Sequence, residues 1–448
     1  MLDSPLIKTF LHNEKYYVYD TNTNLILQVN QNLFLEMEEL ARHGKEHYSS
    51  LSKNTTIYNT IIALMKKGIL FPSPIRQVLH PDTPHIKVLA ERCINQLILG
   101  ITNACNFRCR YCHQAEGKVL SSKAVMNEDI AFKSVDFLYE HSMDAQVVAI
   151  TFYGGEPLLN YKLIKKVVSY ANNKFKHKKV FYNLTTNASL MDEAIIDFFV
   201  KHDFSVLISL DGNARTQNRH RKYLTNGNDT FNAVWKNVNC IRNKYPQYFD
   251  EHIRFNAVIL PDENSNEVME FFTDNGINEN YITIRYADMN GIDYSISPIL
   301  SASVLDNSFL KKEEYKNGIE QFRKKNALPS IWHHNGPCIP AVRRIFVNAE
   351  GLFYPCEKID SDPSCKIGSL KDGLIISNIE KMLNIGRLSA EECKKCWAAR
   401  FCSTCVYHCV DNGNWSKRKK LIHCNQQKKA ALEFLKKYIT DVESEKHE

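Results

Sequence analysis

The hydrophobic pattern of the first 75 residues predicts a small, winged-helix-like α+β domain. Residues 15–30 (KYYVYDTNTNLILQVN) alternate apolar and polar positions around a turn-prone DTNTN, which predicts a β-hairpin. Two segments with helical spacing follow, one ending at Gly44 and the other near Gly68. The segment FPSPIRQVLHPDTPH, residues 71–85, contains four prolines and predicts a linker. The pattern therefore gives a domain over residues 1–75 and a linker over 76–93.

Strand-like and helix-like patterns alternate between residues 94 and 290. The apolar strand-like segments are residues 94–102, 145–153, 179–186, 204–210, 253–260 and 281–287. Six βα units of this kind predict an α/β fold with a parallel sheet, either doubly wound or curled into a barrel. In both architectures the functional surface lies at the carboxyl ends of the strands. Candidate chemistry is therefore expected directly after these segments.

Composition and charge exclude several classes of protein. The 448 residues are 44% hydrophobic and carry a net charge of +7 without clustered basic stretches, so we expect no nucleic-acid partner. The densest basic run, Lys417–Lys420, is read as a solvated face. No apolar run reaches membrane-spanning length, and the N-terminal residues lack the features of a signal peptide. We therefore expect a cytoplasmic protein with no membrane partner.

The fourteen cysteines are unevenly distributed. Three lie within residues 105–112 and nine between 338 and 424, whereas Cys93 and Cys240 stand alone and are expected to be core residues. Disulfides are disfavoured in a reducing compartment. They remain an alternative for the C-terminal nine, but the spacing of Cys393 and Cys396 favours metal or iron–sulfur ligation.

Cys105, Cys109 and Cys112 follow the first predicted strand of the sheet. Three thiolates can hold three irons of a four-iron cluster and leave one iron for an outside ligand. The alternative is a zinc site that borrows a fourth ligand, for which His113 is the nearest candidate. We expect the cluster rather than zinc, and His113 is interpreted as a loop residue rather than a ligand.

Glycines and polar residues follow the second and third strands. Gly154 and Gly155 would let the backbone approach a ligand closely, and the Glu156 carboxylate could hold an ammonium group. Asn187 follows the third strand as a polar handle. A pair of glycines at a strand end is also common in simple turns, so this stretch is informative only together with the other strand ends.

Ser209 and Asp211 lie at the tip of the fourth strand, and Arg221 lies further along the chain. An arginine at this place can bind a ligand carboxylate through two parallel hydrogen bonds. An ordinary turn with a helix N-cap would explain Asp211 alone, but it would not explain the whole series.

In combination, these motifs resemble the radical S-adenosylmethionine (SAM) enzymes. The resemblance rests on CxxxCxxC with Tyr111 before its last cysteine, and on GGEP, TTNASL and SLDG followed by NRHR. It covers roughly residues 94–290 and implies a partial (β/α)6 TIM-like barrel, here placed over residues 94–310. It also implies that SAM binds the open iron of a [4Fe–4S] cluster held by Cys105, Cys109 and Cys112 and yields a 5′-deoxyadenosyl radical.

The resemblance also implies contacts with SAM. By position, Tyr111 would lie beside the adenine, and the methionyl amine would meet Gly154, Gly155 and Glu156. The remaining residues would contact the ribose or the carboxylate: Asn187, Ser209, Asp211 and Arg221.

The C-terminal cysteines resemble a SPASM domain, which carries two auxiliary iron–sulfur clusters; we place it over residues 311–448. Cys338, Gly351 and Cys356 form its CxnGx4C pattern, with a hairpin expected to turn at Glu350–Gly351. The resemblance assigns the second cluster to Cys393, Cys396, Cys402 and Cys424. The family pattern then needs a cysteine after three residues, whereas Cys405 follows Cys402 after two. The first cluster is accordingly assigned Cys338, Cys356 and either Cys405 or Cys409, with Cys365 as a possible fourth ligand.

The two ends of the chain suggest the substrate. SPASM proteins act mostly on peptides, and residues 1–75 resemble the element that captures leader peptides of ribosomally made precursors. CKKCWAARFC is similar to the maturases that form thioether bonds, as in sactipeptides and ranthipeptides. We therefore expect a peptide maturase whose partners are a precursor peptide with a leader and an electron donor such as flavodoxin or ferredoxin.

Several alternatives remain open. The enzyme could instead form carbon–carbon or carbon–oxygen crosslinks, or mature sulfatases anaerobically by making formylglycine. Residues 1–75 could be only a structural cap, and the chain could be a leader-binding scaffold or an electron-transfer protein. Asp288 could assist as a base, or it could be a plain loop aspartate.

Overall fold

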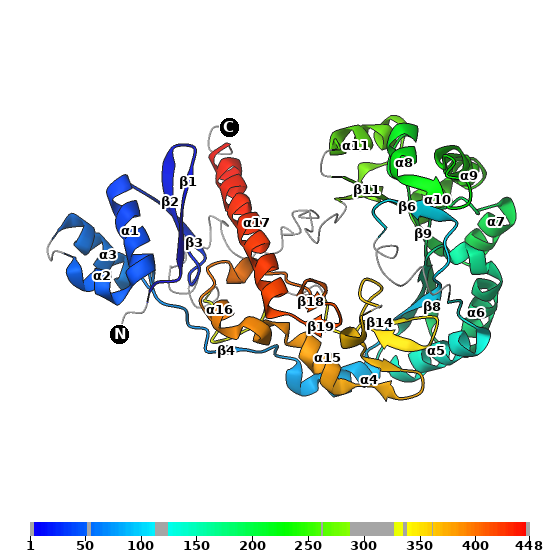
Figure 1. Ribbon diagram of the computed structural model, residues 1–448, viewed down its shortest axis with the longest axis horizontal. Helices are drawn as coiled ribbons and strands as arrows, with labels where there is room; N and C mark the ends of the chain where they lie inside the picture. The colour runs from blue at the N-terminus through cyan, green and yellow to red at the C-terminus, as the bar shows by residue number, and fades with distance from the viewer. Residues whose placement is uncertain are drawn as a thin grey trace.

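The computed structural model describes residues 4–51, 55–112, 124–260, 263–286, 327–334, 338–360 and 362–444. In Figure 1, the N-terminal unit lies beside the long helix α17 (Lys417–Ser444) at one end of the molecule, and the curved α/β region forms the other end. The rest of the C-terminal region lies between them. Within the described ranges, no helix has both the length and the apolar character needed to cross a membrane.

The N-terminal unit is a three-stranded antiparallel sheet with helices packed on one face. Its strands are β1 (Ile7–His12), β2 (Lys15–Asp20) and β3 (Leu25–Val29), in the order β1-β2-β3. Its helices are α1 (Gln31–His43), α2 (Lys45–Ser50) and α3 (Thr56–Lys66). The predicted hairpin is β2–β3, and α1 ends at Gly44 as expected. The sequence reading missed β1 and the short helix α2.

The two faces of this sheet bury different partners, because successive residues of a strand point to opposite sides. Val18 of β2 packs with Met37 and Leu40 of α1. Its neighbours Tyr17 and Tyr19 belong instead to a cluster that includes Phe401, Leu435 and Ile439 of the C-terminal region. The N-terminal unit is therefore joined to the cysteine-rich region, even though they are far apart in sequence.

The barrel part of the ten-stranded central sheet consists of six parallel strands in the order β12-β11-β9-β8-β7-β5. They are β5 (Gln96–Thr102), β7 (Val147–Gly154), β8 (Lys179–Thr186), β9 (Phe204–Ser209), β11 (Ile253–Ile259) and β12 (Ile282–Tyr286). Each coincides with a predicted strand-like segment. Because every strand pairs with the next along the chain and the order never reverses, the sheet winds in one direction as in a barrel, not as in a doubly wound fold.

Helices cover the outer side of this curved sheet (Figure 1). The main ones are α5 (Glu128–His141), α6 (Tyr161–Lys174), α7 (Glu193–Lys201), α9 (Phe231–Lys244) and α11 (Ser265–Asp274). Fully buried strand residues such as Leu97, Ile150, Val206 and Phe255 form one apolar cluster with these helices. This core fixes the strands whose carboxyl ends carry the candidate site. The predicted α/β partial barrel is thereby confirmed.

The predicted linker and the predicted C-terminal hairpin both take part in larger units. Residues 76–93 include β4 (Gln77–Val78) and helix α4 (Ile86–Arg92), so this segment is more regular than its prolines suggested. The hairpin consists of β14 (Arg344–Val347) and β15 (Leu352–Tyr354), with Gly351 at φ +78° in its turn. Strand β14 also pairs in parallel with β5, which the sequence reading did not foresee. The C-terminal hairpin therefore extends the central sheet.

Candidate functional site

The loop after β5 carries the first three cysteines, and a strand pair holds it in place. Cys105 follows β5, and Cys109 ends β6 (Phe107–Cys109). Strand β6 pairs with β10 (Arg221–Tyr223), so that Cys109 lies opposite Arg221. All three thiols, including that of Cys112, are half-buried. The triad thus lies at the carboxyl end of the first barrel strand, as predicted, whereas His113 lies outside the described residues.

The chemistry of these thiols fits iron–sulfur ligation. Burial raises the pKa of Cys105 to about 12 and the pKa of Cys109 to about 11. Metal binding requires the thiolate, so ligation of these thiols would release protons. In the parts of the chain that the structure describes, no three His, Cys, Asp or Glu side chains converge to hold one metal ion. A cluster makes a different demand, because each of its thiolates binds a separate iron.

Gly154 and Gly155 allow β7 to lie directly against the cysteine loop. A Cβ atom on Gly154 would lie 2.1 Å from the Thr102 carbonyl oxygen, and one on Gly155 would lie 2.3 Å from that of Ala104. Gly154 also has φ +140°, a conformation that side chains disfavour. The glycines were expected to permit close approach of a ligand. In the structure, the close approach that they permit is that of the backbone preceding Cys105.

Glu156 is 1% exposed and ties the second strand end to the third. Its carboxylate accepts hydrogen bonds from the Thr186 hydroxyl (2.7 Å) and from the backbone N–H groups of Asn187 (2.7 Å) and Leu158 (3.1 Å). Burial raises the pKa of Glu156 to about 7 despite these donors. This carboxyl group can therefore ionise near neutral pH, and in its ionised form it could bind an ammonium group.

The Asn187 side chain connects the third strand end to the cysteine loop. Its amide nitrogen donates to Asn106 Oδ1 (2.9 Å), and its oxygen accepts from the Ser189 hydroxyl (2.7 Å). The Asn106 amide donates in turn to the Ser189 hydroxyl (2.9 Å). Sequence reasoning missed Asn106, although it lies directly after Cys105.

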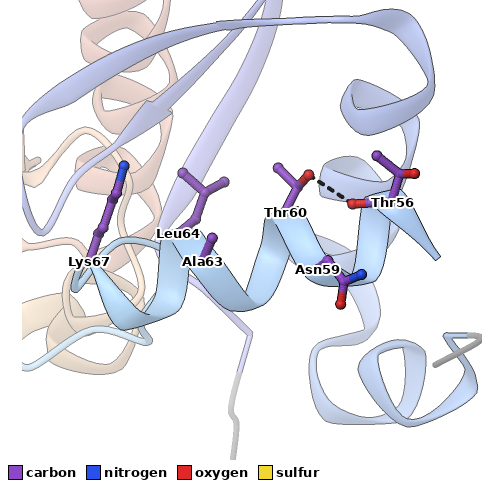
Figure 2. Close-up of a pocket in the computed structure, with 6 residues that line it drawn as sticks. All are labelled: Thr56, Asn59, Thr60, Ala63, Leu64 and Lys67. Atoms are coloured by element: carbon purple, nitrogen blue, oxygen red, sulfur yellow. Dashed lines mark hydrogen bonds between the residues drawn. The ribbon is translucent and has the colours of Figure 1, made fainter. Parts of the chain in front are cut away.

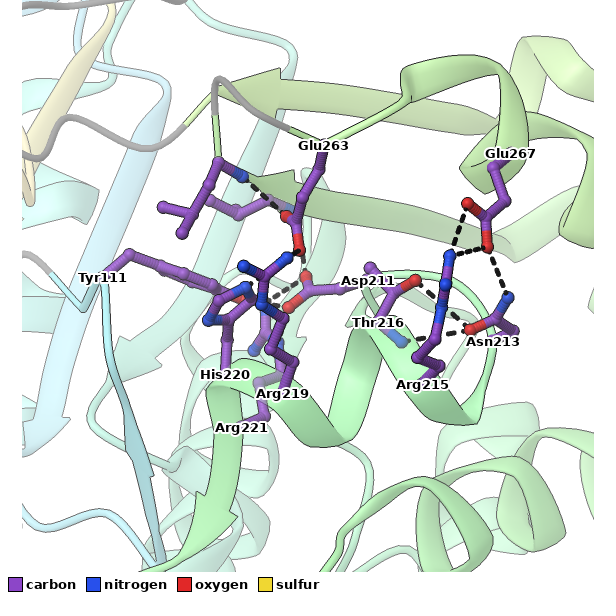
Figure 3. Close-up of polar contacts among 12 residues, drawn as sticks. Tyr111, Asp211, Asn213, Arg215, Thr216, Arg219, His220, Arg221, Glu263 and Glu267 are labelled. Atoms are coloured by element: carbon purple, nitrogen blue, oxygen red, sulfur yellow. Dashed lines mark hydrogen bonds and ion pairs between the residues drawn. The ribbon is translucent and has the colours of Figure 1, made fainter.

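Asp211 and Arg221 form a buried ion pair beside Cys109 (Figure 3). Arg221 donates from Nε to Asp211 Oδ2 (2.8 Å) and from Nη2 to Oδ1 (3.0 Å). Its Nη1 lies 4.0 Å from Cys109 Sγ. The Tyr111 hydroxyl donates to Asp211, and the Arg221 guanidinium lies 5.4 Å from the Tyr111 ring centre. The two-hydrogen-bond grip expected of Arg221 is therefore present, but it holds Asp211.

Neighbouring polar contacts fix the loops after β9 and β11. Glu263 accepts from Arg219 (3.1 Å), from the buried His220 ring (3.0 Å) and from the Leu260 backbone N–H (2.7 Å) (Figure 3). No motif signalled Glu263 in the sequence. Ser209 ends β9, half-buried and opposite Asn256 of β11. Asp288, considered as a base, lies outside the described residues.

The nine C-terminal cysteines divide into two groups by their mutual electrostatic influence. Burial is the largest cause of the raised pKa values of seven of these thiols, and neighbouring cysteines raise the same pKa values further: Cys338, Cys356, Cys365, Cys396, Cys402, Cys405 and Cys424. The first group contains Cys338, Cys356, Cys365 and Cys405. The second contains Cys393, Cys396, Cys402 and Cys424. Cys409 is influenced by members of both groups. All fourteen cysteines lie in described residues, and all are free thiols.

A separate hollow of about 450 Å³ lies along α3 in the N-terminal unit (Figure 2). Its lining residues are Thr56, Asn59, Thr60, Ala63, Leu64 and Lys67. Leu64 and Leu27 of β3 pack against the same apolar cluster. Strand β3 is an edge of its sheet, and its sequence LILQV carries no charge or proline to discourage another strand from pairing.

The fold and this geometry define an α/β protein with candidate cofactor-binding residues at its strand ends and a second, cysteine-rich region. Comparison with known families identifies the first part. Residues 99–274, which include the candidate site and most of the barrel strands that carry it, match the family model of the Radical SAM superfamily. The superfamily uses SAM and a [4Fe–4S] cluster, and these are the cofactors that the three cysteines of the strand-end loop fit.

Individual relatives extend this likeness. The chain is 39% identical over 123 residues to the uncharacterized protein MJ0907 of Methanocaldococcus jannaschii, of whose length it spans only 39%. It is 24% identical over 363 residues to a cysteine-type anaerobic sulfatase-maturating enzyme of Clostridium perfringens, covering 75% of this chain and 94% of that one. Among solved structures, anSMEcpe with bound AdoMet and Kp18Cys peptide has a TM-score of 0.53 at 20% identity. That likeness covers 78% of this chain and 98% of the other, and it concerns the fold.

Proposed function

We propose that this protein is a radical SAM peptide maturase that reductively cleaves SAM and forms thioether crosslinks in a ribosomally made precursor peptide. The observation that carries the proposal is the combination of parts in one chain. A radical SAM domain bears Cys105, Cys109 and Cys112 at its strand ends, and a cysteine-rich region and an N-terminal α+β unit flank it. When bound, SAM and the reduced cluster supply a 5′-deoxyadenosyl radical that abstracts hydrogen from the substrate.

The residues of the strand ends have distinct roles in this proposal. The three thiolates bind three irons and leave the fourth iron to SAM. Glu156 is placed to meet the methionyl amine once it is ionised, and its pKa of about 7 makes that charge available near neutral pH. Asp211 holds the Arg221 guanidinium beside Cys109, so that its third nitrogen is directed toward the cluster site. Tyr111, Asn187 and Ser209 complete the SAM site.

The C-terminal cysteines hold two auxiliary [4Fe–4S] clusters in this proposal. Cys393, Cys396, Cys402 and Cys424 influence one another electrostatically and suit the second cluster. Cys405 influences Cys356 and Cys365, which favours it over Cys409 as a ligand of the first cluster.

Leader recognition belongs to the N-terminal unit. An extended peptide can add to the free edge of β3 by backbone hydrogen bonds, while its side chains enter the hollow along α3. The sulfatase-maturating relative is matched over 94% of its own length but over only 75% of this chain. A quarter of this chain thus has no counterpart there, which favours an additional recognition element over formylglycine formation.

Product analysis tests the reaction. The anaerobically reconstituted protein should release 5′-deoxyadenosine when SAM and a strong reductant are added. If no 5′-deoxyadenosine is released, a non-enzymatic leader-binding scaffold is favoured instead. The proposal predicts a short cysteine-bearing precursor among the neighbouring reading frames, and this precursor should be co-expressed and analysed by mass spectrometry. Loss of two hydrogens per link together with loss of alkylatable thiols supports thioethers. The same mass loss with thiols still alkylatable favours carbon–carbon or carbon–oxygen links, and an aldehyde at a former cysteine favours formylglycine.

A binding experiment tests the leader site separately. Ala63 is exposed in the hollow, so Ala63→Arg should fill it and weaken leader binding at least tenfold by fluorescence anisotropy. Leu11→Arg is the matched control, because Leu11 is 55% exposed on β1 at the opposite edge of the sheet. Equal loss in both variants would argue against β3 and α3 as the site.

A further inference from the structure

Lys420 differs from the rest of the basic run to which it belongs. Lys417, Arg418 and Lys419 are exposed at the start of α17, as expected for a solvated face. Lys420 is only 2% exposed, so the reading of Lys417–Lys420 as uniformly solvated was wrong for this residue. Its ammonium group donates a hydrogen bond to the buried Ser389 hydroxyl and lies 3.4 Å from Cys393 Sγ.

The charge of Lys420 lacks the usual compensation. Among the described residues, no carboxylate forms an ion pair with Lys420. Glu392 is close in sequence to Cys393, but its carboxylate pairs with Lys417 at the surface (2.7 Å). Buried charges in proteins are normally paired or bound to metal sites. Within hydrogen-bond distance, the group that can carry the opposite charge is therefore the Cys393 sulfur. The Glu392 carboxylate attracts Lys420 only over a longer distance.

The surrounding contacts hold the ammonium group in one place. The Ser389 hydroxyl is 1% exposed and lies 3.5 Å from the same Cys393 sulfur. Lys420 lies in the first turn of α17, where its backbone N–H donates a hydrogen bond to the Ser416 carbonyl oxygen (3.1 Å). The side chain thus reaches the cysteine group from a rigid helix.

We propose that Lys420 is the fixed cation of the second auxiliary cluster and raises its reduction potential. The inference rests on the proposed ligand set Cys393, Cys396, Cys402 and Cys424. Reduction adds one electron, and hence one negative charge, to the cluster. A buried positive charge and an N–H···S hydrogen bond at a ligand sulfur both favour the reduced state. The electron comes from a ferredoxin, a flavodoxin or a chemical reductant. Lys420 keeps its proton throughout, and no covalent bond changes. Lys420 therefore affects the reduction potential of the cluster without contacting the substrate.

A redox titration tests this role without SAM or peptide. In a Cys105→Ala, Cys109→Ala, Cys112→Ala background, only the auxiliary clusters remain, and dithionite titration followed by electron paramagnetic resonance gives their midpoint potentials. Lys420→Met should shift one reduction equilibrium at least tenfold against the reduced form, which is 59 mV for one electron. The other auxiliary cluster, held by the group of Cys338 and Cys356, should keep its potential and serve as an internal reference.

Matched variants separate charge from packing. Lys420→Arg keeps the charge and should retain most of the potential, and Lys419→Met removes an exposed charge and should leave both clusters unchanged. Unchanged potentials in Lys420→Met with full iron content would overturn the proposal, as would an equal shift in Lys419→Met. If Lys420→Met loses iron while Lys420→Arg keeps it, the charge is needed to hold the cluster; loss in both variants would assign Lys420 a packing role instead. Failure of the proposed peptide chemistry would leave these potentials unaffected.

Discussion

The two cysteine-bearing regions of this protein are built in opposite ways. The strand-end triad is attached to a parallel sheet whose buried strands form the main apolar core, and the hydrogen bonds of Glu156, Asp211 and Asn187 join its loops. The second C-terminal group is carried by short elements such as α16 (Ala390–Lys394) and the 3-10 turn Ala399–Phe401. A parallel sheet supports the first site, whereas three of the four cysteines of the second group lie in or beside short elements and only Cys424 lies in a long helix, α17.

The apolar surroundings of the second group show the same difference. Cys393 and Cys402 belong to a small cluster with Leu6 and Trp332, and Cys396 packs beside Phe401 in the cluster that contacts the N-terminal sheet. Small cores of this kind gain much of their stability from bound metal. Cofactor loading should therefore affect activity alone at the triad, but both structure and activity at the C-terminal group.

The largest expected effect is loss of activity at the triad. The Cys105→Ala, Cys109→Ala, Cys112→Ala variant should release no detectable 5′-deoxyadenosine, because the cluster that binds SAM has lost its ligands. Its unfolding temperature and its leader affinity should stay close to those of the parent protein, since the barrel core is intact. Liquid chromatography and calorimetry check the two expectations, and residual SAM cleavage would contradict the assignment.

The second effect separates the two regions by stability. Cys393→Ala and Cys424→Ala should each lose one cluster's iron and lower the unfolding temperature by at least ~5 °C, or roughly 2 kcal/mol for a domain of ordinary size. Iron analysis and calorimetry measure both quantities. Cys240→Ala is the control, because Cys240 lies in α9 outside both groups and should leave iron content unchanged. If these variants lowered the unfolding temperature less than the triad variant does, the triad and not the C-terminal group would be the site whose structure depends on its cofactor.

The third effect concerns the scaffold beside the triad. Asp211→Asn leaves the buried Arg221 charge uncompensated and should cost about 3–5 kcal/mol in the free energy of unfolding. Arg215→Ala removes a similar but exposed pair with Glu267 and should cost less than about 1 kcal/mol. Chemical denaturation of both variants makes the measurement. Similar costs in the two variants would mean that the Asp211–Arg221 pair does not support the site.

The sequence predicted the structure of the barrel that carries the triad far better than it predicted the pairing of strands elsewhere in the chain. All six barrel strands were located, because strong apolar runs bounded by turn residues have few competing interpretations. The pairing of β14 with β5 was missed, since nothing local in RRIFV specifies a partner far back in the chain. The first strand, β1, was also missed, because its sequence IKTFLH is too short to show a clear alternation.

Site residues were located better than their contacts. Spacing predicted that the triad and the candidate residues follow the barrel strands, and the structure has them at the strand ends; their roles stay predictions. Spacing did not show that Arg221 grips Asp211, or that Gly155 lies against Ala104. Those contacts depend on how two loops meet in three dimensions. Lys420 illustrates the same limit, because helical phase buries one lysine of a run whose other members are exposed.

The smallest predicted effect concerns the charge of Glu156, and it tests whether the folded protein keeps this carboxyl group protonated up to about pH 7. Its pKa of about 7 in the folded protein lies above the ordinary value of 4.5, so the unfolded chain gives up this proton first. The contribution to stability is therefore fully present below pH 4.5 and decreases as the pH rises to about 7, by about 3 kcal/mol in total. Glu156→Gln should remove this part of the pH dependence in denaturant titrations, whereas the exposed Glu433→Gln should leave it in place. An unchanged pH profile in Glu156→Gln would show that this carboxylate is already ionised, and hence that the scaffold alone, without a ligand ammonium, stabilises its charge.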